Sequence, residues 1–103
     1  MLRYKKPKLG SVIYFLTRSS ISETTVAFRG KDSFLIDEYN DVIDCYKEWF
    51  YNNYNINWFT SFDKAKKQLF RNAKFNPLTE VLVGESYHPG CGYWEIIDRQ
   101  DLK

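Results

Sequence analysis

The chain has 103 residues, of which 44% are hydrophobic, 18% aromatic and 27% charged, and its formal net charge is +2. This apolar content excludes a disordered tail, which buries too little surface to offset chain entropy, and two cysteines are too few for a disulfide scaffold. The longest apolar run, Val12–Leu16, is far shorter than the roughly 20 residues of a membrane-spanning helix. The sequence therefore predicts one domain over residues 1–103 that makes no contact with a membrane. It also predicts a reducing cytoplasm as the location, which would be that of the host cell if the protein is phage-encoded.

The charge alternates in blocks along the chain. The first 31 residues hold seven bases and one acid, and residues 61–75 hold five bases and one acid, whereas the two remaining blocks are acidic. We favour the interpretation that neighbouring blocks face and partly neutralise one another, because exposed ion pairs contribute only about 0–1 kcal/mol and need no function. The alternative is a polarised surface with a basic face for an acidic partner.

Three strands are predicted in the first 36 residues. Ser11–Arg18 is apolar on both faces, which is typical of a central strand. Glu23–Arg29 alternates between apolar and polar residues, and Ser33–Ile36 is a short third strand. Because turn residues separate the three segments, we expect an antiparallel meander.

Asp37–Tyr54 has the spacing of an amphipathic helix. Six apolar residues recur at helical intervals: Tyr39, Val42, Ile43, Tyr46, Trp49 and Phe50. We expect Trp49 on the buried face of this helix. The opposite face carries Asp41, Asp44 and Glu48, which have no apolar pocket to raise a pKa, so no catalytic role is predicted for them.

A second helix and a hairpin complete the predicted fold. Thr60 or Ser61 is expected to cap a helix that runs to about Lys74 and stops before Asn76-Pro77. Glu80–Tyr87 and Tyr93–Asp98 then form a hairpin whose connection, His88-Pro89-Gly90-Cys91, fits a type II turn. The predicted fold class is α+β, a small single domain with an antiparallel sheet in the order βββ-αα-ββ and two helices packed on one face.

The strongest candidate site is a row of four cations on the second predicted helix. The row consists of Lys64, Lys67, Arg71 and Lys74, whose spacing places them on one side, apart from the apolar stripe. Such a row can lie along a phosphate backbone or an acidic protein surface. It is equally well explained as the solvated face that every surface helix needs.

Aromatic residues in the Asn-rich connection between the helices are a second candidate. Tyr51, Tyr54 and Trp58 could contact a partner, because aromatic side chains among adaptable polar residues are common in binding surfaces. The alternative is that Trp58 and Phe59 close one end of the core, and we expect Phe59 to be buried.

Two weaker candidates lie at the N-terminus and in the hairpin turn. Arg3, Lys5, Lys6 and Lys8 form a secondary basic patch, which is also common on ordinary soluble strand ends. His88 and Cys91 make half of a zinc site, but the sequence has no second histidine and only one other cysteine. We therefore expect no metal, no cofactor and no catalytic residue.

Three functions remain, and no motif resembles a particular family. The leading hypothesis is a non-enzymatic binding protein that occupies the surface of an acidic protein or a nucleoprotein complex. The small size, and an amino-acid usage that hints at an AT-rich genome, would suit an accessory or inhibitory protein of a phage or mobile element, of the anti-defence or anti-CRISPR type. The first alternative is a nucleic-acid-binding protein that uses the same basic helix face, and the second is a small metal-free ribonuclease.

Overall fold

The computed structural model describes residues 6–40 and 45–102, and within these ranges the chain is mostly β-structure. The strands are β1 (Val12–Leu16), β2 (Ser20–Arg29), β3 (Ser33–Asn40), β4 (Cys45–Phe50), β5 (Trp58–Phe59), β6 (Glu80–His88) and β7 (Cys91–Asp98). The helices are α1 (Phe62–Ala73) and the short 3₁₀ turns η1 (Tyr51–Asn53) and η2 (Arg99–Asp101). No helix in the described ranges is long and apolar enough to cross a bilayer.

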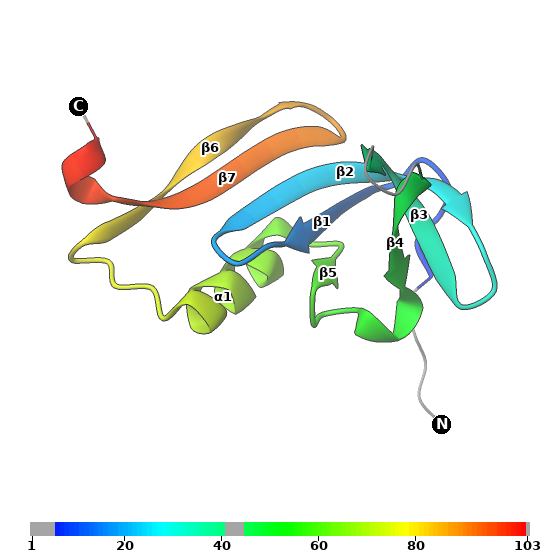
Figure 1. Ribbon diagram of the computed structural model, residues 1–103, viewed down its shortest axis with the longest axis horizontal. Coiled ribbons are helices and arrows are strands. Elements are labelled where there is room, and N and C mark those ends of the chain that lie inside the picture. The colour runs from blue at the N-terminus through cyan, green and yellow to red at the C-terminus, as the bar shows by residue number, and fades with distance from the viewer. Residues whose placement is uncertain (1–5, 41–44, 103) are drawn as a thin grey trace.

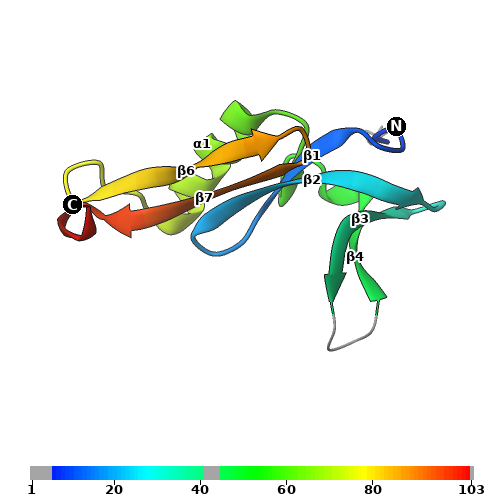
Figure 2. The same cartoon turned by 90° about the horizontal axis from the view of Figure 1, so that it is seen from above.

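Strand β2 organises the whole antiparallel sheet. One edge of β2 pairs with β1, and its other edge pairs first with β7 through residues 20–23 and then with β3 through residues 26–29. Strand β5 lies beyond β1, β4 beyond β3, and β6 beyond β7. The β3–β4 hairpin turns away from the β6–β7 hairpin, so the sheet curls into a half-barrel (Figures 1 and 2).

The predicted first helix over Asp37–Tyr54 is wrong, and so is the predicted fold class with two helices on one face of a sheet. Strand β3 continues to Asn40, and β4 followed by η1 occupies 45–53; Asp41 and Asp44 lie outside the described residues. The apolar residues of this segment are mostly aromatic or β-branched, which favours strands. Pairing of β3 with β4, in which Phe34 lies opposite Trp49, overrides the helical spacing.

The remaining predicted elements are confirmed with shifted ends. Ser61 caps α1, since its Oγ accepts a hydrogen bond from the Lys64 backbone N–H at 3.4 Å. The helix ends at Ala73, and the following Lys74 is left-handed, with φ of 53°. In the β6–β7 turn Gly90 has φ of 88°, the positive value that a type II turn requires at this position.

Two hydrophobic clusters lie on opposite faces of β1. One contains Ile13, Phe15, Val26, Phe34, Ile36, Tyr51 and Trp58, with Trp49 half-buried against it. The other contains Leu16, Ile21, Phe59, Ala65 and Leu69, where α1 covers the sheet (Figure 1). The two residues of β5 point to opposite sides, so Trp58 enters the first cluster and Phe59 the second. Trp49 therefore contacts the core as expected, although it does so from a strand.

Candidate binding surface

The four cations predicted to form a row all lie exposed along α1 and its C-terminal cap. We call Lys64, Lys67, Arg71 and Lys74 the cation ridge. The burial of Ala65 and Leu69 fixes the orientation of α1, because these residues must face the sheet. Within the part of the chain that the structure describes, no carboxylate forms an ion pair with the ridge. The ridge therefore keeps its positive charge available to a partner.

Three of the ridge cations share one shallow depression of about 180 Å³. It is lined by Asn55, Phe59, Lys64, Lys67, Gln68 and Arg71. The Gln68 side chain is oriented by a hydrogen bond in which its Nε2 donates to Asn72 Oδ1 at 2.8 Å. The described lining thus combines three cations and two amides with no carboxylate, which suits an acidic group on a partner.

A tight turn between η1 and β5 builds the second wall of this depression. Asn55 has φ of 65°, a left-handed conformation that asparagine tolerates, and its N–H donates to the Trp58 carbonyl at 2.9 Å. The next residue, Ile56, is 60% exposed. Sequence reasoning overlooked Ile56, although it is the one aliphatic residue among the asparagines of this loop.

The end of α1 places a cation where glycine is the preferred residue. Lys74 adopts the left-handed conformation of the helix cap, which costs a residue with a Cβ about 1–2 kcal/mol relative to glycine. Its charge recovers part of this cost by interacting with the negative end of the helix dipole. A lysine at this position thus destabilises the backbone relative to glycine, but it adds one more cation to the ridge.

Trp58 and Phe59 take the core positions that the sequence analysis held as the alternative, and Tyr51 is buried as well. Tyr51 is 2% exposed and Trp58 is fully buried, and Trp58 Nε1 donates to the Phe50 carbonyl at 2.8 Å. Tyr54 is half-buried, with its ring centroid 4.8 Å from that of Trp58. The burial of Phe59 is confirmed. Tyr51 and Trp58 are therefore not available at the surface for a partner.

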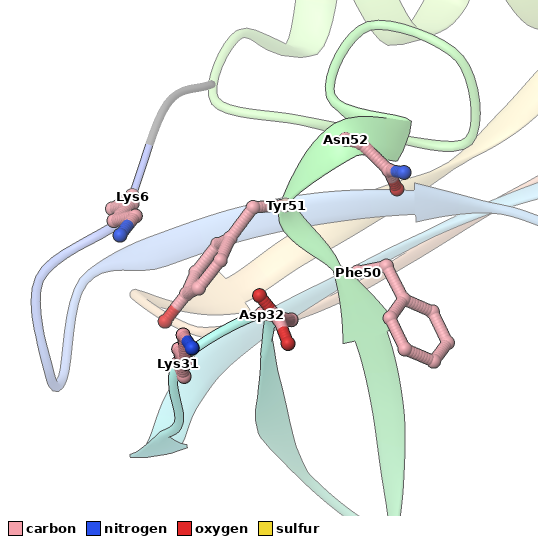
Figure 3. Close-up of a pocket in the computed structure, with 6 residues that line it drawn as sticks. All are labelled: Lys6, Lys31, Asp32, Phe50, Tyr51 and Asn52. Carbon is pink, nitrogen blue, oxygen red and sulfur yellow. The ribbon is translucent and has the colours of Figure 1, made fainter. Parts of the chain in front are cut away.

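The secondary basic patch is described only in part. Arg3 and Lys5 lie outside the described residues, whereas Lys6 and Lys8 are exposed. Their segment is held against β2 because the Gly10 N–H donates to the Val26 carbonyl at 2.8 Å. Lys6 and Lys8 line one depression of about 340 Å³ with Thr60, and Lys6 also borders the pocket drawn in Figure 3.

A buried carboxylate that the sequence did not reveal lies at the fork between β2, β3 and β7. Glu23 is only 8% exposed, and its Oε2 accepts a hydrogen bond from the Gly90 N–H at 2.8 Å. Tyr14, which lies opposite Glu23 in the β1–β2 register, has a raised pKa because of its burial and, next, the charge of Glu23. The contact with Gly90 fastens the hairpin turn to β2, so we assign Glu23 a structural role.

The hairpin turn gathers no ligand set for a metal. His88 and Cys91 pair across the turn, and His88 Nδ1 lies 3.3 Å from the Pro89 carbonyl oxygen. Among the described residues, no three side chains of His, Cys, Asp or Glu come together as metal ligands would. Comparison with protein-family models, curated proteins and solved structures finds no match. A functional proposal for this chain therefore rests on its residues and their geometry.

Proposed function

We propose that this chain is a non-catalytic binding protein whose cation ridge docks on an acidic protein surface. One observation carries the proposal: Lys64, Lys67 and Arg71 line a single depression that has no carboxylate among its described lining residues. Separated surface lysines could be explained by solubility alone. Three convergent cations repel one another, and an acidic partner would relieve that repulsion.

The surroundings of the ridge favour a protein partner over a nucleic acid. Ile56 adds an exposed aliphatic side chain directly after Asn55, and protein interfaces reward an apolar contact beside charged residues. Binding of unpaired nucleotides gains much of its affinity from bases stacked on exposed aromatic rings. The aromatic residue of the depression, Phe59, is 2% exposed and offers no such surface.

The mechanism is steric and electrostatic. The ridge would accelerate encounter with an acidic patch, and the Ile56 loop would supply the contact that becomes desolvated. An inhibitory or accessory role for a phage or mobile element, including an anti-defence role, is the setting we propose. That setting rests on size and composition.

A pull-down with a matched pair of charge reversals tests this function. The tagged full chain is incubated with nuclease-treated lysate of the source cells, beside the Lys67→Glu/Arg71→Glu variant and the control Lys66→Glu. Lys66 neighbours Lys67 on α1 but does not line the depression. We expect the double variant to lose its protein partner and the control to retain it.

Two results would overturn the proposal. One is a double variant that keeps every partner, which would make the ridge a solubilising surface. The other is capture that nuclease treatment abolishes, together with binding to random-sequence RNA or DNA that falls steeply between about 50 and 200 mM salt. That second result would establish nucleic-acid binding instead.

A further inference from the structure

Another pocket, which none of the ridge cations lines, lies beside the side chain of Tyr51. Its volume is about 240 Å³, and it is lined by Lys6, Lys31, Asp32, Phe50, Tyr51 and Asn52. These residues come from three segments: the N-terminal segment, the β2–β3 turn and the junction of β4 with η1. The pocket therefore depends on the tertiary fold rather than on one loop.

Tyr51 holds together the segments that form this pocket. The hydroxyl of Tyr51 donates to the Gly30 carbonyl at 2.9 Å, and its backbone N–H donates to the Asp32 carbonyl at 3.1 Å. Its ring stacks on Phe34 in the core, with centroids 5.7 Å apart. Because the hydroxyl, the backbone and the ring are all held, the buried Tyr51 fixes the chain segments that carry the exposed lining residues, and a ligand would meet a pocket that is already in place.

Two ammonium groups and one carboxylate line the pocket. Lys6 Nζ lies 5.4 Å from the centroid of the Tyr51 ring. In Figure 3, Lys6 lies on one side of the ring and Asp32 on the other, whereas Lys31 lies near the hydroxyl end of the ring and the Phe50 ring points away. Within the described ranges neither lysine forms an ion pair with a carboxylate. The rim of the pocket thus carries both signs of charge, with Lys31 and Asp32 adjacent in the β2–β3 turn.

We propose that this pocket binds a small sugar phosphate. A phosphate monoester carries a charge of about −2 near neutral pH, which the ammonium groups of Lys6 and Lys31 together match. The Asp32 carboxylate repels the phosphate but accepts hydrogen bonds from hydroxyl groups, so it selects a ligand that carries both. The volume is below the roughly 300–1,000 Å³ of pockets for larger ligands, which favours a compact molecule.

Calorimetric titration of the full chain with three probes tests this inference: ribose 5-phosphate, inorganic phosphate and ribose. We expect ribose 5-phosphate to bind more tightly than either fragment. Lys31→Met should weaken binding of both phosphate-bearing probes about tenfold, because it removes one charge-assisted contact. Lys66→Met, a lysine outside the pocket, is the control and should change neither affinity.

Asp32→Ala separates the two parts of the proposed recognition. It removes a negative charge, so inorganic phosphate should bind more tightly, while the preference for ribose 5-phosphate over inorganic phosphate should shrink. Circular dichroism of each variant confirms that it is folded. The proposal is overturned if ribose 5-phosphate fails to bind, if Lys31→Met binds it as the wild type does, or if Asp32→Ala leaves the preference unchanged. The Lys67→Glu/Arg71→Glu variant should bind ribose 5-phosphate normally, so failure here is distinguishable from failure of the cation ridge.

Discussion

Replacement of two tryptophans by phenylalanine should have opposite consequences, because only one indole N–H has a partner. Trp58 is fully buried, and its Nε1 donates to the Phe50 carbonyl at 2.8 Å. Trp49 is half-buried, and its buried Nε1 has no acceptor among the described residues. Phenylalanine removes the N–H in both cases, so the comparison isolates the hydrogen bond.

The expected magnitudes follow from these environments. Either substitution loses packing worth about 1 kcal/mol. Trp58→Phe also leaves the Phe50 carbonyl without its donor, which costs about 1–3 kcal/mol, so its total cost should be about 2–4 kcal/mol. Trp49→Phe instead removes a buried polar group without a partner, and this gain of about 1–3 kcal/mol offsets the lost packing. Its net effect should therefore lie between no change and a stabilisation of about 2 kcal/mol.

Urea unfolding followed by far-UV circular dichroism measures both free energies without depending on tryptophan fluorescence. With a slope of about 1–2 kcal/mol per molar urea, Trp58→Phe should lower the midpoint by about 2 M. Trp49→Phe should leave the midpoint unchanged or raise it. Equal decreases for the two variants, or a larger decrease for Trp49→Phe, would refute the assignment of the hydrogen bond.

Three further predictions concern the backbone and one titrating group. Gly84→Ala should cost about 3 kcal/mol or more in urea unfolding, because its φ is 149° and a Cβ there would lie 1.9 Å from the Tyr93 carbonyl oxygen. Gly10→Ala, where φ is also positive but the surrounding space is open, should cost about 1–2 kcal/mol. Equal costs for the two variants would contradict this reasoning. Lys74→Gly should stabilise the protein by about 1 kcal/mol and so raise its thermal midpoint, because glycine adopts the left-handed conformation of the cap without strain. The same variant should weaken partner binding. A lowered midpoint would contradict the proposed strain at the cap. Burial and, next, the Glu23 charge raise the pKa of Tyr14, so the folded state holds this proton more tightly than the unfolded state, and stability is lost as the pH rises above about 10. Tyr14→Phe should lose less stability than the wild type over this range, whereas the exposed Tyr87→Phe should behave as the wild type does.

The local signals in the sequence explain why α1 and the N-terminal strands could be predicted. Ser61 before the apolar stripe marks the start of a helix, and the two apolar faces of Val12–Leu16 require a strand with cores on both sides. These patterns act within a few residues of each other, so they need no knowledge of the partner strand.

The segment after Asp37 could not be predicted in this way. Its aromatic residues recur at an interval compatible with a helix, but the same residues fit a hairpin when Phe34 and Trp49 pair across β3 and β4. That choice depends on contacts between residues distant in sequence, those of Trp49 with Phe15 and of Tyr51 with Phe34. The error also carried into the candidate site, because a loop after a helix would have exposed Tyr51 and Trp58. The cation ridge was unaffected, since its spacing lies within α1.

One edge of β2 pairs with two different hairpins in succession, first with β6–β7 and then with β3–β4. Each hairpin pairs with its own part of β2, and the hydrogen bond between Glu23 and Gly90 lies at the boundary between the two parts. The β6–β7 turn is fastened to β2 through Gly90, so an insertion there would disturb this contact but need not disturb the pairing of β3 with β4. The β3–β4 hairpin is therefore the more independent of the two, because the β6–β7 hairpin also packs against α1 through Trp94 and Phe62.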